Sequence, residues 1–272
     1  MFNSYLLFSL LLAPDVSSSS ATVKMFQDCE ECPEMVVVPA GSFLMGDPGG
    51  WYSRRTERPQ HQVKIATPFA VGRYEVTFDE WDACVSDGGC NGNIPDDFGF
   101  GRGKRPVFNI SWNSAQAYIT WLNAKSGQVY RLLTEAEWEY MARASATTSY
   151  TTGDTITTDQ ANFNNNPHNT RIGDTINRNM TLPVGSFAPN KFGIYDVEGN
   201  VTEYTQDCWH ESYENAPSNG DAWIKDGACE KRVARGGAWG DTLTGVRLSS
   251  RGAFLYYRTS VSYGFRLAKS LN

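Results

Sequence analysis

The chain has 272 residues, of which 40% are hydrophobic, and its formal net charge is -6 at pH 7. This length and apolar content suffice for a sizeable core, in one large domain or two small ones. The acidic balance and the lack of any basic run argue against a nucleic-acid partner and weakly favour cation binding.

The N-terminal residues 1–21 are predicted to be a signal peptide. Their apolar run, Tyr5 to Ala13, is far shorter than the roughly 20 residues that cross a bilayer, and it leads into small residues at 17–21. No Lys or Arg stands in residues 1–4, where a signal peptide usually carries one. We expect a secreted or periplasmic protein without a membrane span in its mature form, and we interpret residues 22–34 as an N-terminal linker.

The six cysteines are even in number and allow 15 pairings. Local spacing suggests three bonds. Cys84 and Cys90 flank a flexible Val-Ser-Asp-Gly-Gly loop, and a bond between Cys208 and Cys229 would pin a long polar loop. Bonds of this kind are typical of oxidising compartments, in agreement with secretion.

Cys29 and Cys32 form a lone Cys-Glu-Glu-Cys motif. A structural zinc site needs a second ligand pair at matching spacing, and none is evident. Thioredoxin-like redox chemistry is less expected still, because no βαβ pattern surrounds the motif. We therefore expect a disulfide or two free thiols here.

The first half of the chain alternates strand and helix signals. Residues 35–45, MVVVPAGSFLM, predict a β-hairpin, and residues 63–71 predict a further strand. Thr77 with Glu80 forms a capping box, which predicts a helix. A second helix is expected from about Asn113 to Gly127.

The middle of the chain is less regular. A strand at residues 130–133 leads into a second capping box, Thr134 with Glu137, and a third helix. Residues 145–181 lose all periodicity and predict a long irregular loop, which is uncommon unless the loop is functional or pinned. A bound ion would pin it. Strand signals return at residues 182–187.

Residues 193–204 carry the clearest chemical signal. A strand-like alternation meets a Glu-Gly-Asn turn, after which Asn200 and Glu203 stand three residues apart. Calcium takes oxygens from carboxylates, Asn side chains and backbone carbonyls, and a glycine turn lets carbonyls converge. The alternative is an ordinary polar strand after a Gly-Asn turn.

Seven motifs occur in a fixed order, and together they resemble the formylglycine-generating enzyme (sulfatase-modifying factor) family over about residues 35–270. They are MVVVPAGSF at 35–43, EVT at 75–77, PV at 106–107 with SW at 111–112, RLLTEAEWEY at 131–140, GNVTE at 199–203, RGGAW at 235–239 and GFR at 264–266. The resemblance implies one α+β domain, residues 35–270, with a C-type-lectin-like fold of low regular secondary structure. We expect a monomer.

The resemblance also implies structural calcium, because the family binds calcium at two sites. Carried over by motif, one site takes ligands from a single segment: the carbonyls of Gly199 and Val201, with the side chain of Asn200 or Glu203. The other takes ligands across the long loop: the side chain of Asn162, the carbonyl of Phe163, and Asp174 with Ile176.

The chain departs from the family at the copper site. In the oxygen-dependent enzymes two cysteines shortly after the Gly-Gly motif bind copper, for which thiolates are suitable soft ligands. Here Asp241 stands where the first should fall, Ala238 replaces the family's serine, and residues 240–251 hold no cysteine. Cys208 and Cys229 precede the motif and cannot be given that role. Copper is therefore not expected, and no catalytic residue is assigned.

Three functions remain open. The chain is interpreted first as a binding or accessory module for a protein, peptide or small-molecule ligand. The second is an oxidase or tailoring enzyme of the sulfatase-modifying or siderophore-maturation type, the latter branch being secreted and without the copper cysteines. The third is a retroelement-diversified receptor, whose variable face would be residues 240–263.

The candidate ligand-binding residues lie in or beside that face, and each has a structural alternative. They are Asp241, Arg247, Phe254, Tyr256 and Tyr257. Exposed tyrosines and small polar neighbours are typical of binding loops. Alternatively, the aromatic side chains fill the core beneath the loop, and a buried carboxylate at Asp241 or Glu203 pairs with Arg235 or Arg247.

Overall fold

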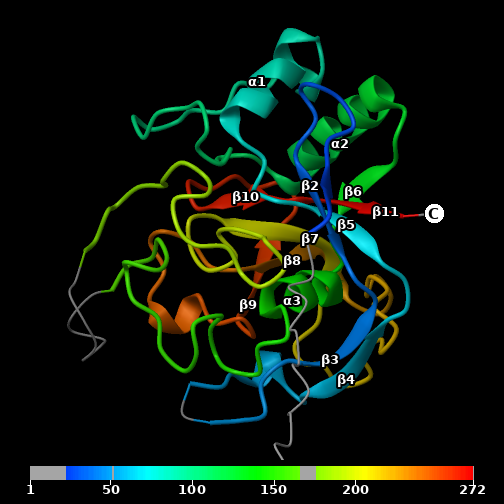
Figure 1. The fold of residues 1–272 in the computed structure, drawn as a ribbon, viewed down its shortest axis with the longest axis vertical. Helices are drawn as coiled ribbons and strands as arrows, with labels where there is room; N and C mark the ends of the chain where they lie inside the picture. Colours follow the sequence, from blue (N-terminus) through cyan, green and yellow to red (C-terminus); the bar gives the residue numbers. More distant parts are fainter. Residues whose placement is uncertain (1–22, 51, 166–175, 272) are drawn as a thin grey trace, which may run out of the picture.

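The fold is α+β. The computed structural model describes residues 23–50, 52–165 and 176–271, and within them the chain forms three sheets, three α-helices and long connecting loops (Figure 1). The helices are α1 (Phe78–Ser86), α2 (Trp112–Ser126) and α3 (Glu135–Arg143), with short 3-10 turns η1 (Arg55–Glu57), η2 (Cys90–Gly92) and η3 (Leu243–Gly245).

The strands divide among sheets of five, four and two. The five-stranded sheet has the order β1 (Met25–Phe26), β2 (Met35–Val38), β5 (Phe69–Gly72), β11 (Leu267–Ser270) and β6 (Tyr130–Leu132). The four-stranded sheet has the order β10 (Tyr263–Phe265), β7 (Thr202–Trp209), β8 (Ala228–Arg235) and β9 (Arg251–Leu255). The two-stranded sheet pairs β3 (Gly41–Met45) with β4 (His61–Ile65).

Both predicted capping boxes are present. At α1 the Thr77 backbone N–H donates to the Glu80 carboxylate at 2.7 Å, and the Glu80 N–H donates back to the Thr77 hydroxyl at 3.3 Å. At α3 the same exchange joins Thr134 and Glu137, at 2.9 and 3.0 Å. Each box satisfies two N–H groups that the first turn of a helix leaves without partners, which explains why both helices begin where the sequence indicates.

Helix α2 also agrees closely with the prediction. The Ser111 hydroxyl accepts from the Ser114 N–H at 3.1 Å, so the helix begins one residue before Asn113. It ends at Gly127, whose φ of +66° is the left-handed conformation that glycine adopts without strain.

The strand predictions were less accurate. The hairpin predicted at residues 35–45 is wrong, because β2 pairs with β1 and β5 whereas β3 pairs with β4 in another sheet. The single strand at 63–71 is wrong for the same reason: it is divided between β4 and β5. Residues 182–187 form no strand, and the Val184 N–H donates instead to the Lys104 carbonyl at 2.8 Å. Local turn signals do not determine which strand becomes the hydrogen-bonding partner.

The segment interpreted as a linker, 22–34, contributes to the domain. Its strand β1 is an edge of the five-stranded sheet, and Cys29 is bonded to Cys32. The predicted signal peptide lies outside the described residues.

Two large apolar clusters form the core. One surrounds α1 and α2 and includes the fully buried Trp81, and the other surrounds α3 and includes the fully buried Trp138. The irregular loop has a small core of its own, in which Tyr150 and Phe163 pack with Val246. Among its described residues the loop is therefore held by packing.

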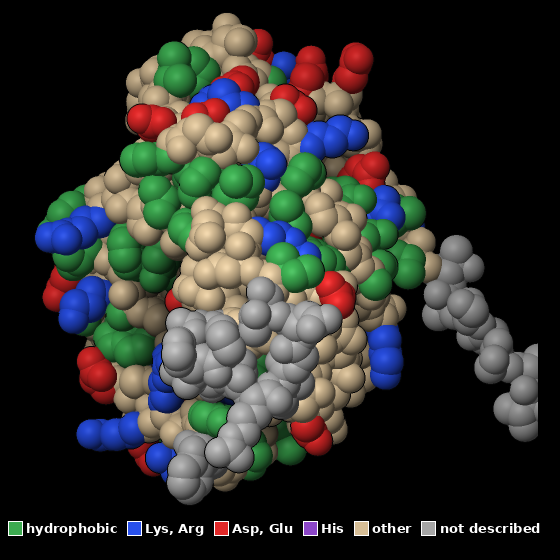
Figure 2. Space-filling view, turned by 90° about the vertical axis from the view of Figure 1, so that its left-hand side faces the viewer, with side chains coloured by type: hydrophobic (Ala, Val, Ile, Leu, Met, Phe, Trp, Pro, Cys, Tyr) green, Lys and Arg blue, Asp and Glu red, His purple; other side chains and the backbone are tan. Residues whose placement is uncertain are grey.

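Charged side chains are dispersed over the surface. On the face drawn in Figure 2, blue and red side chains stand mostly singly, with acidic groups gathered at the upper end. This distribution agrees with the acidic composition. In the described parts of the chain, no helix combines the length and apolarity that crossing a membrane requires.

Candidate functional site

All six cysteines are bonded in pairs. The bonds are Cys29 to Cys32, Cys84 to Cys90 and Cys208 to Cys229, which confirms the pairing favoured by local spacing. No cysteine is therefore free to serve as a thiolate ligand or nucleophile.

A polar cavity of about 220 Å³ lies where the Gly-Gly motif meets the four-stranded sheet. Asp241 lies in its wall, together with the hydroxyl-bearing Thr202 and Tyr263 and the guanidinium groups of Arg54 and Arg251. These groups can donate and accept hydrogen bonds but offer no thiol. The cavity is suited to a small polar ligand.

A tight turn fixes Asp241 in this wall. Its carboxylate accepts from the Ala238 N–H at 2.9 Å, and its own N–H donates to the Ala238 carbonyl at 2.9 Å. The turn requires glycine at 237, because φ is +68° there and a Cβ would lie 2.8 Å from the Gly245 carbonyl oxygen. The motif therefore positions the carboxylate through its backbone.

Tyr263 also lines the cavity. It stands beside Thr202 across the parallel pair of β10 and β7, and its ring stacks on Phe254 with centroids 4.0 Å apart. Burial, and to a lesser extent the charge of Asp241, raise the pKa of Tyr263 to about 12. At neutral pH its hydroxyl is therefore protonated and can donate to a ligand.

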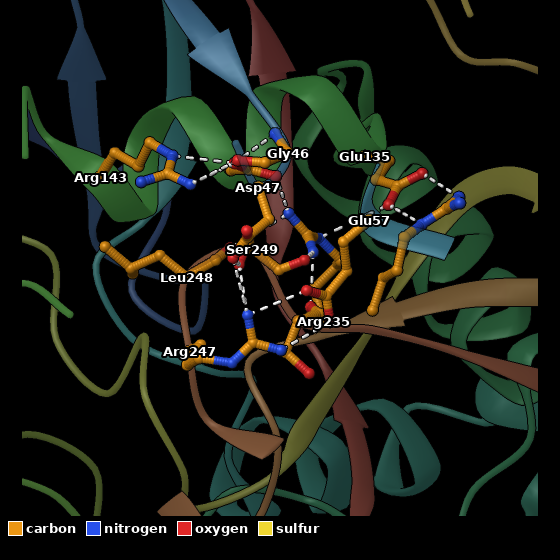
Figure 3. Close-up of polar contacts among 12 residues, drawn as sticks. Gly46, Asp47, Glu57, Glu135, Arg143, Arg235, Arg247, Leu248 and Ser249 are labelled. Carbon is orange, nitrogen blue, oxygen red and sulfur yellow. Dashed lines mark hydrogen bonds and ion pairs between the residues drawn. The ribbon is translucent and has the colours of Figure 1, made fainter. Parts of the chain in front are cut away.

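Beneath the cavity lies a buried network of ion pairs (Figure 3). Arg251 makes two bonds of 2.7 Å to the carboxylate of Glu135, and Arg235 pairs with Glu139. Burial alone would raise the pKa of Glu139, but Arg143 and Arg235 hold it below its usual value. Arg251 donates to Glu135 through Nε and Nη2 and to the carbonyls of Thr56 and His210 through Nη1, so it supports the cavity wall rather than offering a free cation.

Arg247 belongs to the same network. It is 2% exposed, and its guanidinium donates to Glu57 at 2.7 and 2.9 Å and to Asp47 at 3.0 Å (Figure 3). The structure therefore places this predicted ligand-binding residue in the core, away from any ligand-accessible surface. The acidic partners Glu57, Glu135 and Glu139 were missed by the sequence analysis.

Comparison with known proteins identifies the family. The model of the sulfatase-modifying factor enzyme 1-like domain matches residues 21–271. The chain belongs to this family. A formylglycine-generating enzyme of Streptomyces coelicolor is 28% identical over 293 residues, covering 86% of this chain and 88% of that enzyme. The solved structure of PvdO from Pseudomonas aeruginosa is 35% identical with a TM-score of 0.79, covering 91% of this chain and 98% of that one.

Two further relatives are proteins of other kinds. Serine/threonine-protein kinase pkn1 of Chlamydia caviae is 28% identical over 261 residues, and the match spans 88% of this chain but only 38% of the kinase. Chaperone protein LppX of Paenibacillus barcinonensis is 26% identical over 285 residues, covering 87% of this chain and 89% of that protein. The domain thus occurs in proteins with several different names.

The residues of this family member do not fit a copper site. The position expected for the first copper cysteine holds Asp241, and every cysteine of the chain is already in a disulfide. A carboxylate is a hard ligand and does not replace the soft thiolate pair that cuprous ion favours. No chemistry through copper follows from this cavity.

The side chains expected at the first calcium site are occupied by protein partners. Glu203 accepts from Arg266 at 2.7 Å through one oxygen and from the Trp138 indole N–H at 2.7 Å through the other. The amide oxygen of Asn200 accepts from the Leu182 N–H at 2.9 Å. The carbonyls of Gly199 and Val201 remain predicted ligands on the family pattern.

Two further acids lie near this segment and were missed by the sequence analysis. Glu75 accepts from the Asn200 amide and the Val201 N–H at 3.0 and 3.2 Å. Burial raises the pKa of Glu75 well above its usual value and that of Asp196 to about 6. Nevertheless, among the residues that the structure describes, no three His, Cys, Asp or Glu side chains lie close enough together to hold a metal ion.

At the second predicted calcium site, by contrast, one expected ligand oxygen has no protein partner among the described residues. The side-chain oxygen of Asn162 is buried and, within the described part of the chain, has no hydrogen-bond partner. Its amide nitrogen donates to the Met180 carbonyl at 2.9 Å, so the oxygen is the free end. Phe163 is buried and Ile176 is exposed, while Asp174 lies outside the described residues. An orphaned hard oxygen fits a calcium ligand.

The face at residues 240–263 divides into two regions. Arg251 and Gly252, at the start of β9, line the cavity, whereas Tyr256 and Tyr257 follow the other end of that strand and are 37% and 56% exposed. At about 3.4 Å per residue, a five-residue strand separates the two regions by roughly 15 Å. Phe254 packs inward on Tyr263, as the alternative interpretation expected.

Proposed function

We propose that this family member is a secreted binding or accessory module that does not carry out copper-dependent oxidation. The observation that carries the proposal is the cavity at Asp241. Its wall is polar, the Gly-Gly turn holds Asp241 in place, and no cysteine lines it. A carboxylate, a protonated tyrosine hydroxyl and an exposed Arg54 are groups that recognise a ligand rather than transfer electrons.

One comparison and one structural observation support the proposal. The match to chaperone protein LppX covers most of both chains, and the name chaperone denotes assistance rather than oxidation. The three disulfides also fit an oxidising compartment, where secretion would place the protein. The alternatives make different predictions: a copper-dependent oxidase would retain copper, and a diversified receptor would bind its ligand through the variable face at residues 240–263.

The ligand is expected to be a small polar group presented by a protein, peptide or metabolite. A cavity of about 220 Å³ is below the range of roughly 300 to 1,000 Å³ that holds drug-sized molecules, so it accommodates one side chain or head group. Asp241 and Arg54 give it both charges, which suits a ligand with a donor and an acceptor close together. Tyr256 and Tyr257 would contact the outer part of a larger partner.

The test is a binding screen with matched variants. Peptide and metabolite libraries are applied to the wild type, and each hit is measured again by calorimetry with Asp241→Asn. We expect Asp241→Asn to weaken a cavity ligand at least tenfold. Asp154→Asn, an exposed substitution of the same chemistry outside the cavity, should leave affinity unchanged. Equal affinity of all three proteins for every hit would contradict a ligand site at Asp241.

We further propose a structural calcium ion at Asn162, supported by its orphaned side-chain oxygen. A ligand at 100 times its dissociation constant stabilises a protein by about 2.7 kcal/mol, so calcium should raise the melting temperature by about 5 to 10 °C. We expect Asn162→Ala to lose most of this shift and the exposed control Asn219→Ala to retain it. Equal calcium shifts in both variants would exclude Asn162 as a ligand.

A further inference from the structure

The disulfide between Cys208 and Cys229 lies in the wall of a cavity of about 300 Å³, separate from the cavity at Asp241. The wall comes from α2, β6, β7 and β8 and from Ile224 in the loop between β7 and β8. Besides the two cysteines, it includes Trp112, Arg131, Gln206 and Arg232. Both cysteines line this cavity, but Cys208 is only 1% exposed, so the half-buried Cys229 is the one that an external molecule can reach.

Arg232 places a positive charge directly on this disulfide. Its Nη1 lies 3.4 Å from the Cys208 Sγ and donates to the Gln206 carbonyl at 2.8 Å. The guanidinium also lies 4.2 Å from the centre of the Trp112 ring, which holds it in the wall. Arg131, the other arginine of the cavity, is neutralised by Glu137 at 2.6 Å.

Part of Arg232 remains unsatisfied. Its Nε is buried and has no hydrogen-bond partner within the described residues, although buried N–H groups are nearly always paired. Asp207 lies close enough to interact electrostatically with the guanidinium, but among the described residues no carboxylate forms an ion pair with it. A negatively charged group entering the cavity would therefore meet a positive charge that has no paired counter-ion. The cavity is thus suited to an anion.

The other two disulfides lie in different surroundings. Cys84 and Cys90 are 0% and 2% exposed, so an external thiol cannot reach them without local opening. Cys32 lies in a cavity that Glu30, Glu31 and Glu34 also line, and these acids would repel an anionic thiolate. Lys104 also lines that cavity, but it stands among these acids, whereas at the Cys208–Cys229 bond Arg232 lies 3.4 Å from a sulfur atom.

We propose that the Cys208–Cys229 disulfide is a thiol-exchange site for small anionic thiols, with Arg232 as the residue that binds the anion and stabilises the departing sulfur. The proposal is independent of the ligand cavity at Asp241. It assigns a redox activity to a bond that the fold could otherwise use only as a structural link.

The exchange proceeds in two balanced steps. The thiolate of the small molecule attacks Sγ of Cys229, the more exposed sulfur, and the electron pair of the broken S–S bond leaves on Cys208 as a thiolate beside Arg232. A second thiolate then attacks the small molecule's sulfur in the mixed disulfide, and the electron pair of that broken S–S bond leaves on Cys229 as a thiolate. Two thiols are oxidised to one small disulfide, and the protein bond gains two electrons and, on protonation, two protons.

The experiment measures the reduction rate of each disulfide separately. The folded wild type is incubated at pH 7.5 with 2-mercaptoethanesulfonate, which is anionic, or with cysteamine, which is cationic. Samples are alkylated at intervals and the reduced cysteines are quantified by peptide mass spectrometry. Each rate is divided by that of the same thiol with a small model disulfide, which removes differences in intrinsic reactivity.

We expect the Cys208–Cys229 bond to be reduced at least tenfold faster than the other two bonds by the anionic thiol, and to prefer this thiol over the cationic one. Arg232→Gln should lower the anionic rate about tenfold and remove the preference. Arg232→Lys keeps the charge and should remain within about threefold of the wild type. Lys231→Gln, which removes the same charge from the exposed neighbouring position, should change nothing.

Two results would overturn the proposal. One is an unchanged preference in Arg232→Gln, and the other is reduction of the Cys29–Cys32 bond ahead of the Cys208–Cys229 bond. Circular dichroism before and after exposure verifies that each protein stays folded. If Arg232→Gln does not fold, the wild type and Arg232→Lys still test the mechanism. Both should be reduced faster by the anionic thiol than by the cationic one, and equal normalised rates in both proteins would contradict the mechanism.

Discussion

The ion pair between Glu203 and Arg266 gives the sharpest stability prediction. Both side chains are buried, at 1% and 0% exposure, and their closest atoms are 2.7 Å apart. At an effective dielectric constant of about 20, unit charges at this separation attract by about 6 kcal/mol, part of which offsets the cost of removing both groups from water. We expect Glu203→Gln, which leaves Arg266 buried without a counter-charge, to lower the free energy of unfolding by about 3 to 5 kcal/mol.

The assay is urea unfolding at pH 7 with the disulfides kept oxidised, followed by tryptophan fluorescence. The double variant Glu203→Gln with Arg266→Met should lose at least about 2 kcal/mol less than the sum of the single variants, because the two groups interact directly. Glu214→Gln is the exposed control. A change below about 1 kcal/mol for Glu203→Gln would refute the argument. Since both oxygens of Glu203 have protein partners, calcium should stabilise this variant as much as the wild type.

Two further predictions concern pH and the backbone. Burial, together with the nearby charge of Glu135, raises the pKa of Asp207 to about 7, above its value when unfolded. The folded state therefore binds more protons than the unfolded state between about pH 4 and 7, and the free energy of unfolding should fall by up to about 4 kcal/mol as pH rises through this window. When the free energy of unfolding, measured with urea, is plotted against pH, Asp207→Asn should show a smaller slope than the wild type. An identical slope in both proteins would contradict a raised pKa at Asp207. Gly199→Ala should cost at least about 2 kcal/mol in the same assay, because φ is +88° and a Cβ would lie 2.2 Å from the Asn162 carbonyl oxygen, whereas Gly240→Ala meets open space and should be nearly neutral.

The sequence predicted features whose causes are local. The capping boxes at Thr77 and Thr134 need only four consecutive residues, so both helix starts could be read directly. The disulfide between Cys84 and Cys90 likewise closes a short loop. The motif order then identified the family, and with it the C-type-lectin-like fold.

Features that depend on distant partners could not be predicted from residue patterns. The hairpin at residues 35–45 failed because β2 finds its partners in β1 and β5, which no turn signal reveals. The network under the cavity joins Glu139 to Arg235 across 96 positions of sequence. The sequence gives one indication of this network: Glu135 and Glu139 stand one helical turn apart in a helix whose other face is apolar.

In the candidate site, too, the features with local causes could be predicted and those that depend on distant partners could not. The motif indicated Asp241 and the absence of copper cysteines, but it could not show that Tyr263 faces the same cavity or that Arg247 is buried under it. It also grouped Tyr256 and Tyr257 with Asp241, although β9 separates them. Which residues share a surface is decided by strand pairing and packing rather than by nearness in sequence.

Copper content is the most direct test of the central claim. The protein is purified without chelator, loaded with cuprous ion under inert gas without any added thiol, desalted and analysed by mass spectrometry, and oxygen uptake is then measured with a cysteine-containing peptide. The account predicts far less than one copper per chain and no uptake above the protein-free control, because no free thiolate is available. One retained copper per chain together with peptide-dependent oxygen consumption would contradict it.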